Sequence, residues 1–172
     1  MANGHPPADR GSIMVNWTDI NLRDPTMQPY MIRSMTISDY DAVIDLLKQT
    51  PGVTFRDADS RDATARYLQR NPGLSFVALA DGRLAGCIMS GHDGRRGYLQ
   101  HLVVSTDMRR NGIARALVHH CIEALGKEGI AKSHLDVLRS NENGAAFWQH
   151  LGWTLRTDLQ RFSFVASGGS NA

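Results

Sequence analysis

The sequence predicts a single domain of mixed α/β structure, and three observations lead to that prediction. Strand-like and helix-like segments alternate along most of the chain. Asp81-Gly82 separates two apolar segments in the way that the central residues of a β-hairpin do. A strand-like segment at 98–104, a helix-like segment at 112–127 and a second strand-like segment at 133–138 suggest a right-handed crossover that pairs these strands in parallel.

The first elements are a strand and two helices. Residues 31–37 suit a strand, and Ser38 is a plausible N-cap with Asp41 three residues later in a box-like position. The apolar residues that follow at helical spacing are Tyr40, Val43, Ile44 and Leu47. A second helix is predicted from near Ser60 to Arg70, where an Asn-Pro-Gly sequence stops it.

The remaining elements complete an antiparallel meander and add the crossover. The helix at 112–127 has one apolar face, and Glu123 and Lys127 are correctly ordered for an i,i+4 ion pair. A short helix and a final strand are expected after the crossover. In chain order, these segments are the strands 75–80, 83–91 and 98–104, the helix 112–127, the strand 133–138, the helix 143–151 and the strand 160–165.

Composition limits the protein class. The 172 residues are 42% hydrophobic, which is ordinary for a globular domain. A net charge of only +2 argues against a protein that works mainly by binding nucleic acid. No apolar run is long enough to span a membrane, and the N-terminus lacks the pattern of a secretory signal. Cys87 and Cys121 lie in apolar runs and suggest buried thiols in a reducing compartment, so a cytoplasmic protein is expected.

The two ends of the chain differ from its middle. Residues 1–28 contain several prolines and no clear period, which indicates an N-terminal extension. Residues 29–166 form the expected domain, and 167–172 have the composition of a flexible tail.

The stretch MRRNGIAR, residues 108–115, is typical of an anion site at a helix start. The first amides of a helix lack intrahelical acceptors and carry about half a positive charge. Gly112 lets the backbone approach a ligand, and Arg109 and Arg110 add charge. Taken alone, the stretch fits a phosphate-type ligand and a solvated basic helix start equally well.

Two segments together resemble the GNAT superfamily of acetyl-CoA-dependent N-acetyltransferases. In VVSTDMRRNGIARAL, Arg109, Gly112 and Ala114 occupy the three defining places of its first motif. In the second, HLDVL is followed by Asn141 and by AAFWQHLGW at 145–153. The resemblance implies a central mixed, mostly antiparallel sheet flanked by helices and splayed between the two motif strands. It also implies acetyl-CoA as cosubstrate, with no metal.

The resemblance further implies a cofactor site. The first-motif strand of the family bulges, and the pantetheine arm lies beside its backbone near Val103 and Val104. The diphosphate binds the amides from Arg110 to Ala114. The implied cofactor-binding residues are Leu102, Val103, Val104, Arg109, Arg110, Asn111, Gly112, Ile113, Ala114, Arg115, Asn141, Asn143, Phe147 and Trp148.

The catalytic groups are less well defined. The resemblance places the amide of Leu102 at the developing oxyanion. The family often has a general base at positions that match Tyr98 or Gln100, but glutamine is no base. His101 is a suitable base, yet strand parity turns it to the opposite face unless a bulge reverses it, so a structural role is favoured. Trp148 stands where many relatives have a tyrosine as general acid, and it supplies no useful acidity.

The acceptor is expected to be an amine, either of a small molecule or of a protein. Asp57, Asp59 and Asp62 lie where this family usually builds the acceptor pocket, although loop solubility and helix capping also explain them. A non-catalytic acyl-CoA-binding or regulatory module is the alternative function. No nucleic-acid or membrane partner is expected, and a homodimer is one expected assembly beside the monomer.

Overall fold

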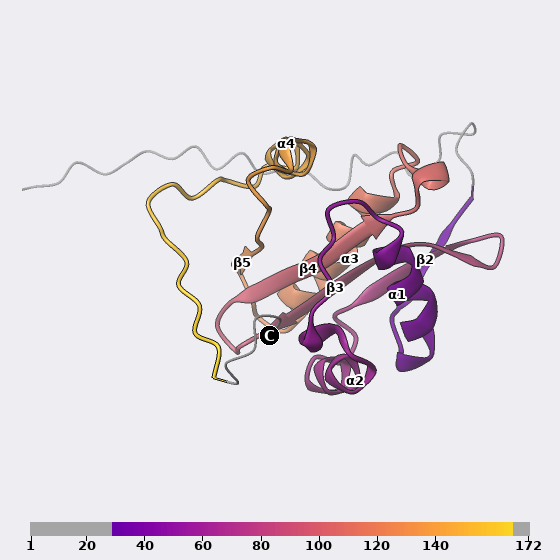
Figure 1. The fold of residues 1–172 in the computed structure, drawn as a ribbon, viewed down its shortest axis with the longest axis horizontal. Helices are drawn as coiled ribbons and strands as arrows, with labels where there is room; N and C mark the ends of the chain where they lie inside the picture. The colour runs from indigo at the N-terminus through magenta and orange to yellow at the C-terminus, as the bar shows by residue number, and fades with distance from the viewer. Residues whose placement is uncertain (1–28, 167–172) are drawn as a thin grey trace, which may run out of the picture.

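The structure is a computed structural model that describes residues 29–166 (Figure 1). The predicted extension 1–28 and tail 167–172 lie outside the described residues. Within them, one five-stranded sheet has the order β1-β2-β3-β4-β5. Its strands are β1 (Met31–Ser34), β2 (Phe76–Ala80), β3 (Arg83–His92), β4 (Gly97–Val104) and β5 (Ser133–His134).

Neighbouring strands pair antiparallel from β1 to β4, and β4 pairs parallel with β5. This arrangement confirms the mixed, mostly antiparallel sheet and the parallel crossover. The hairpin between β2 and β3 is also confirmed, because Asp81 and Gly82 both have positive φ, 48° and 72°, as a tight hairpin turn of this kind requires.

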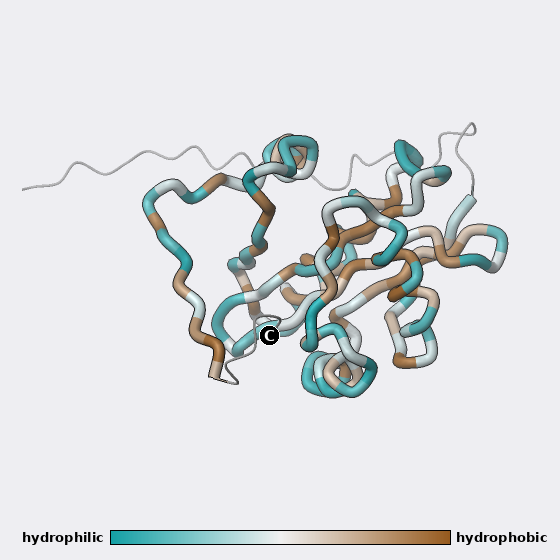
Figure 2. Tube along the Cα trace, viewed as in Figure 1, coloured by the Kyte–Doolittle hydropathy of each residue, from teal (hydrophilic) through white to brown (hydrophobic). Residues whose placement is uncertain are grey.

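Helices cover both faces of this sheet. They are α1 (Tyr40–Lys48), α2 (Arg61–Arg70) and α3 (Ile113–Lys127), whereas α4 (Glu142–His150) follows β5 and lies apart from these faces (Figure 1). Leu117 and Cys121 of α3 pack in one buried cluster with Leu99 of β4. Val43 of α1 packs in a second cluster with Val103 of β4. The sheet therefore separates α3 from α1 and α2, and hydrophobic residues concentrate along its strands (Figures 1 and 2).

Three short 3₁₀ turns connect these elements: η2 (Ile37–Asp39), η3 (Asp57–Asp59) and η4 (Thr106–Met108). The predicted thiols are confirmed as buried and free, because both cysteines are fully enclosed. Burial raises the pKa of Cys87 and of Cys121 to about 12. Neither thiol is therefore a nucleophile at neutral pH.

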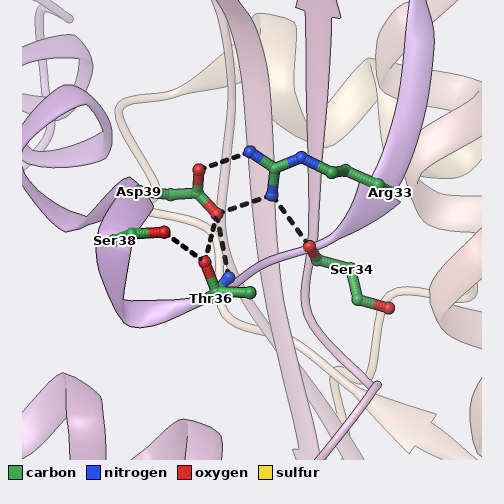
Figure 3. A network of polar contacts seen from close by, with 5 residues as sticks. All are labelled: Arg33, Ser34, Thr36, Ser38 and Asp39. Carbon is green, nitrogen blue, oxygen red and sulfur yellow. Dashed lines mark hydrogen bonds and ion pairs between the residues drawn. The ribbon is translucent and has the colours of Figure 1, made fainter.

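The start of α1 corrects the sequence prediction of an N-cap at Ser38 with Asp41. The cap lies two residues earlier, at Thr36 with Asp39, because η2 precedes α1: the Asp39 carboxylate accepts the Thr36 N–H at 2.8 Å. Arg33 of β1 donates two hydrogen bonds to the same carboxylate, at 2.8 and 2.6 Å (Figure 3). This network joins the end of β1 to the first helical turn. The cap of α2 agrees with its prediction, since the Ser60 hydroxyl accepts from the Ala63 N–H at 3.4 Å.

Of the two strands predicted near the C-terminus, one is shorter than predicted and one is absent from the described residues. The strand expected at 133–138 consists of Ser133 and His134, and 160–165 forms no strand. Both segments suit β-structure, but a strand also needs a neighbour to pair with. The side chains of Phe162 and Phe164 are 87% and 92% exposed, so this last segment is not packed against the sheet.

No helix within residues 29–166 is long and apolar enough to cross a membrane.

Candidate functional site

A bulge in β4 forms the centre of the candidate site. Cys87 of β3 is opposite Val103, but Met89 is opposite Gln100, so β4 contains one residue more than β3 between these pairs. Ile88 therefore faces both His101 and Leu102. His101 has φ of 51°, a left-handed conformation that is uncommon for residues other than glycine.

The bulge changes the direction of His101. Met89 and Cys87 belong to the cluster on the α1 and α2 side of the sheet, so their partners Gln100 and Val103 face that side. In a regular strand, His101 would point away from Gln100. Instead its imidazole reaches η3, which immediately precedes α2. The exception to strand parity that was named for a bulge therefore applies, because the bulge allows both Gln100 and His101 to face the same side.

His101 meets Asp59 on this side. Its Nε2 lies 2.7 Å from Oδ1 of Asp59, and the two side chains are 21% and 12% exposed. The other carboxylate oxygen, Oδ2, accepts the Arg56 N–H at 2.8 Å. The Tyr40 hydroxyl donates to the Asp59 carbonyl at 2.9 Å. Hydrogen bonds to its side chain and to its backbone carbonyl therefore fix the position of Asp59 next to the imidazole.

Sequence reasoning missed this pair. It grouped Asp59 with Asp57 and Asp62 as an acidic loop, and it favoured a structural role for His101 from strand parity unless a bulge reversed the side chain. Because 42 residues separate the partners, no local pattern relates them. The usable signal was the expected bulge, since a bulge re-aims a side chain.

The second part of the site is the turn that opens α3. Arg110 and Gly112 have φ of 64° and 76°, and the intervening Asn111 donates from its side-chain amide to the carbonyls of Met108 and Arg109 at 3.2 and 3.4 Å. The first α-helical hydrogen bond runs from the Ala116 N–H to the Gly112 carbonyl at 3.0 Å. The amides before Ala116 therefore have no intrahelical acceptor.

No side chain competes for these amides within the first turn. Gly112 provides no capping group, and the first turn of α3 contains no acidic residue. Ile113 is buried and anchors the turn in the core, while Ala114 and Arg115 are half-buried. The arrangement provides backbone donors, a helix dipole and nearby guanidinium groups, which together suit a phosphate group.

Arg109 connects this turn to the bulged strand. Its Nε donates at 3.2 Å to the carbonyl of Val104, the last residue of β4. Val103 is buried opposite Cys87, and Val104 is half-buried opposite Gly86. The bulge, the end of β4 and the helix start thus lie along one continuous stretch, 101–114.

The sheet separates next to this stretch. β4 and β5 share two residue pairs, Gly97 with Ser133 and Tyr98 with His134, and the chain then runs away from β4 toward α4 (Figure 1). A cavity of about 620 Å³ lies beside β5, where Tyr98 of β4, Trp148 of α4 and residues between 153 and 162 line it, and none of residues 99–114 does. The separation of the two motif strands therefore matches the splayed sheet expected from the resemblance.

The residues predicted on α4 have different surroundings. Asn141 is the N-cap, and its Oδ1 accepts the Gly144 N–H at 2.9 Å, so its side-chain amino group remains as a donor. Asn143 is exposed on the first turn. Phe147 is half-buried and its ring lies 5.2 Å from that of Trp148, which in turn lies 5.0 Å from Trp153. The aromatic residues form a packed cluster beside the cavity.

The sequence matches known proteins over most of the described domain. Residues 40–153 match the model of the acetyltransferase (GNAT) family. An acetyltransferase from Pectobacterium atrosepticum is 32% identical over 120 residues, which cover 70% of this chain and 84% of that protein.

Solved structures agree with this match. The ribosomal-protein-S18-alanine N-acetyltransferase of Escherichia coli is 26% identical, with a TM-score of 0.62 over 72% of this chain and 77% of that one. The PaiA N-acetyltransferase of Thermoplasma acidophilum, solved in complex with coenzyme A, has a TM-score of 0.67 over 74% of this chain and 91% of that one. At 21% identity, the second likeness concerns the fold alone.

Proposed function

This chain belongs to the acetyltransferase (GNAT) family, and from that premise we propose that it transfers the acetyl group of acetyl-CoA to a primary amine by direct attack in a ternary complex. The observation that carries the proposal is the helix start at Gly112, with its left-handed turn and no acidic residue in the first turn. Such a helix start binds the diphosphate of coenzyme A through backbone amides. Arg109 and Arg110 supply positive charge beside it.

The bulge supports the position of the reactive thioester. Beyond the diphosphate, the pantetheine arm would run along the end of β4, beside Val103 and Val104, toward His101 and Leu102. A bulged residue leaves backbone groups outside the regular ladder. The Leu102 amide would donate to the carbonyl oxygen as it becomes an oxyanion. A single donor of this kind contributes roughly 3 to 4 kcal/mol to transition-state stabilisation.

The reaction requires no acyl-enzyme. The lone pair of the neutral amine attacks the thioester carbon and forms the C–N bond. The tetrahedral intermediate then collapses, the C–S bond breaks, and the sulfur leaves as the thiolate of coenzyme A. The nitrogen releases its extra proton to water, and the thiolate takes up one from water. Trp148 takes no part in that last step, because its indole N–H is not an acid.

The experiment is an assay of thiol release from acetyl-CoA with a panel of amines. The panel contains lysine, spermidine, an aminoglycoside and a peptide that begins with alanine, the last because the E. coli neighbour bears the name of such a substrate. Amine-dependent thiol release, with the acetylated product found by mass spectrometry, supports the proposal. Tight coenzyme A binding without turnover would favour a non-catalytic acyl-CoA-binding module. No binding at all would overturn both functions.

A further inference from the structure

We propose that His101 and Asp59 act together at the acceptor end of the site: Nδ1 of His101 takes a proton from the incoming ammonium group, and Asp59 positions the imidazole for this step. The inference rests on the proposed function, because it specifies which residues prepare the amine. It assigns a catalytic role to His101 and a positioning role to Asp59.

The need for such a group comes from the chemistry of amines. An alkyl ammonium ion with a pKa of about 10 is neutral in only about one molecule in a thousand at pH 7, and the protonated form has no lone pair to attack. A base close to the thioester raises the neutral fraction at the moment of reaction. General bases in enzymes typically contribute about 10²- to 10⁴-fold in rate.

The backbone supplies the first argument. His101 occupies a left-handed conformation at φ of 51°, which costs free energy for a residue with a Cβ. This conformation places the imidazole on the side of η3 while the next residue, Leu102, stays half-buried against the opposite core. The proposed proton acceptor and the proposed oxyanion donor are thus adjacent residues on the bulge.

The hydrogen bond to Asp59 supplies the second argument. A carboxylate only accepts, so at 2.7 Å the imidazole must donate to it from Nε2. In the neutral imidazole, the lone pair then lies on Nδ1, which becomes the basic atom. The Arg56 amide and the Tyr40 hydroxyl hold Asp59 in place, so the ring is held through it. This is the way in which a buried carboxylate fixes the tautomer of a catalytic histidine in other enzymes.

The other polar side chains of β4 are weaker candidates. Gln100 is exposed and has no basic atom. Tyr98 lies beside β5, where its ring is 5.9 Å from that of His134, and it lines the cavity bordered by β5, α4 and residues between 153 and 162. His101 is the residue among these three that combines a basic atom with a fixed orientation.

The proton balance is closed. The ammonium ion gives one proton to Nδ1, and the resulting imidazolium keeps the Nε2–H bond to the Asp59 carboxylate. The neutral amine attacks, the C–N bond forms and the C–S bond breaks. The second proton of the nitrogen passes to water, and the departing thiolate takes up a proton from water. The imidazolium then releases its proton to water after the products leave, and the pair returns to its first state.

The test is Asp59→Asn, with Asp45→Asn as matched control, since Asp45 is an exposed carboxylate on α1 away from the bulge. Asparagine can donate its own amide hydrogen to Nε2, which reverses the tautomer and moves the proton to Nδ1. We expect kcat to fall on the order of tenfold to a hundredfold, with coenzyme A affinity unchanged. The control should behave as the wild type. His101→Gln, which retains a donor toward Asp59 but has no basic atom, should lose about a hundredfold or more.

An NMR measurement distinguishes a role of Asp59 in setting the tautomer of His101 from a purely structural contact between the two residues. In ¹⁵N-histidine-labelled protein, the His101 signals are assigned by their loss in His101→Gln. We expect the Nε2–H tautomer in the wild type and the Nδ1–H tautomer in Asp59→Asn. A wild type with the Nδ1–H tautomer, or an Asp59→Asn protein with full turnover, overturns the inference while the acetyltransferase stands. A wild type that acetylates none of the amines overturns the proposed function and the role of the pair together.

Discussion

Arg109 donates its Nε hydrogen to the carbonyl oxygen of Val104 at 3.2 Å, and this bond joins the end of the bulged strand to the turn that opens α3. One side chain thereby sets the distance between the two halves of the proposed coenzyme A site. Because the guanidinium group has further N–H groups, it can hold Val104 and still contact a phosphate oxygen.

Arg109→Ala should therefore weaken coenzyme A binding by about tenfold, which corresponds to about 1.4 kcal/mol. The measurement is isothermal titration calorimetry. Arg83→Ala serves as control, because Arg83 is equally charged and exposed but lies at the start of β3 in the hairpin. Equal affinities for Arg109→Ala and the wild type would remove this arginine from the site.

Gly112→Ala should destabilise the protein. Residue 112 has φ of 76°, and this left-handed conformation raises the free energy of an alanine by about 1 to 2 kcal/mol. The loss is conformational rather than steric, since an added Cβ would meet only the Tyr30 hydroxyl at 3.7 Å. The opposite change, Arg110→Gly, relieves φ of 64° and should maintain or raise the free energy of unfolding. Urea denaturation measures both, and an Arg110→Gly protein that loses as much as Gly112→Ala would contradict the argument.

Trp148→Phe should keep most of the turnover, within about threefold, because the indole supplies no acid and the cluster with Phe147 and Trp153 tolerates another ring. The smaller ring should lower the melting temperature by a few degrees at most. Initial rates at saturating acetyl-CoA provide the check. A collapse of kcat with normal coenzyme A affinity would show that Trp148 has a direct role in the reaction.

His120 makes the stability depend on pH. Burial, with a smaller contribution from neighbouring His119, lowers the pKa of His120, whose ring lies 5.3 Å from that of Phe76. The unfolded chain, with a histidine pKa of about 6.5, binds this proton more readily. The contribution of neutral His120 to the free energy of unfolding is therefore fully present above about pH 6.5. It is lost as the pH falls toward the lowered pKa of His120 in the folded protein. His120→Gln should flatten the curve of unfolding free energy below about pH 6.5, measured by urea denaturation at several pH values, with His150→Gln at an exposed position as the control.

Asp39→Asn should cost about 1 kcal/mol at pH 7, because it removes a two-point ion pair and weakens a helix cap. Hydrogen bonds from Arg33 lower the pKa of Asp39 most, and hydrogen bonds from Thr36 lower it further by a smaller amount. This stabilisation is present above the ordinary Asp pKa of about 3.9 and disappears as the pH falls through the lowered value. The difference between Asp39→Asn and the wild type should therefore shrink in acid. A difference in Tm that stays constant down to pH 2 would exclude the ion pair as its source.

The sequence was most informative where the structure is locally determined. The Asp81-Gly82 turn, the Ser60 cap and the helix that begins after Gly112 each depend on residues within a few positions of one another. Their conformations follow from turn and capping chemistry, so they could be predicted.

Features that depend on distant partners could not be predicted in the same way. The orientation of His101 requires the bulge, and its contact with Asp59 requires the position of η3. The strand predicted at 133–138 pairs with β4 only at Ser133 and His134, and the segment 160–165 forms no strand, although both have suitable residues. Strand propensity describes a residue's fit to a sheet, whereas strand formation depends on neighbours that only the fold provides.

The brief contact between β4 and β5 has a further consequence. Two residue pairs hold the chain after residue 132 to the sheet, with the aromatic cluster of α4 as the second attachment. This part can open locally while the four antiparallel strands stay intact. A molecule that bridges the helix start of α3 and the amino group of Asn141 would close that opening, since a ligand adds its binding free energy to whatever it spans. The supply of acetyl-CoA would then govern how readily proteases cut the enzyme between residues 135 and 141.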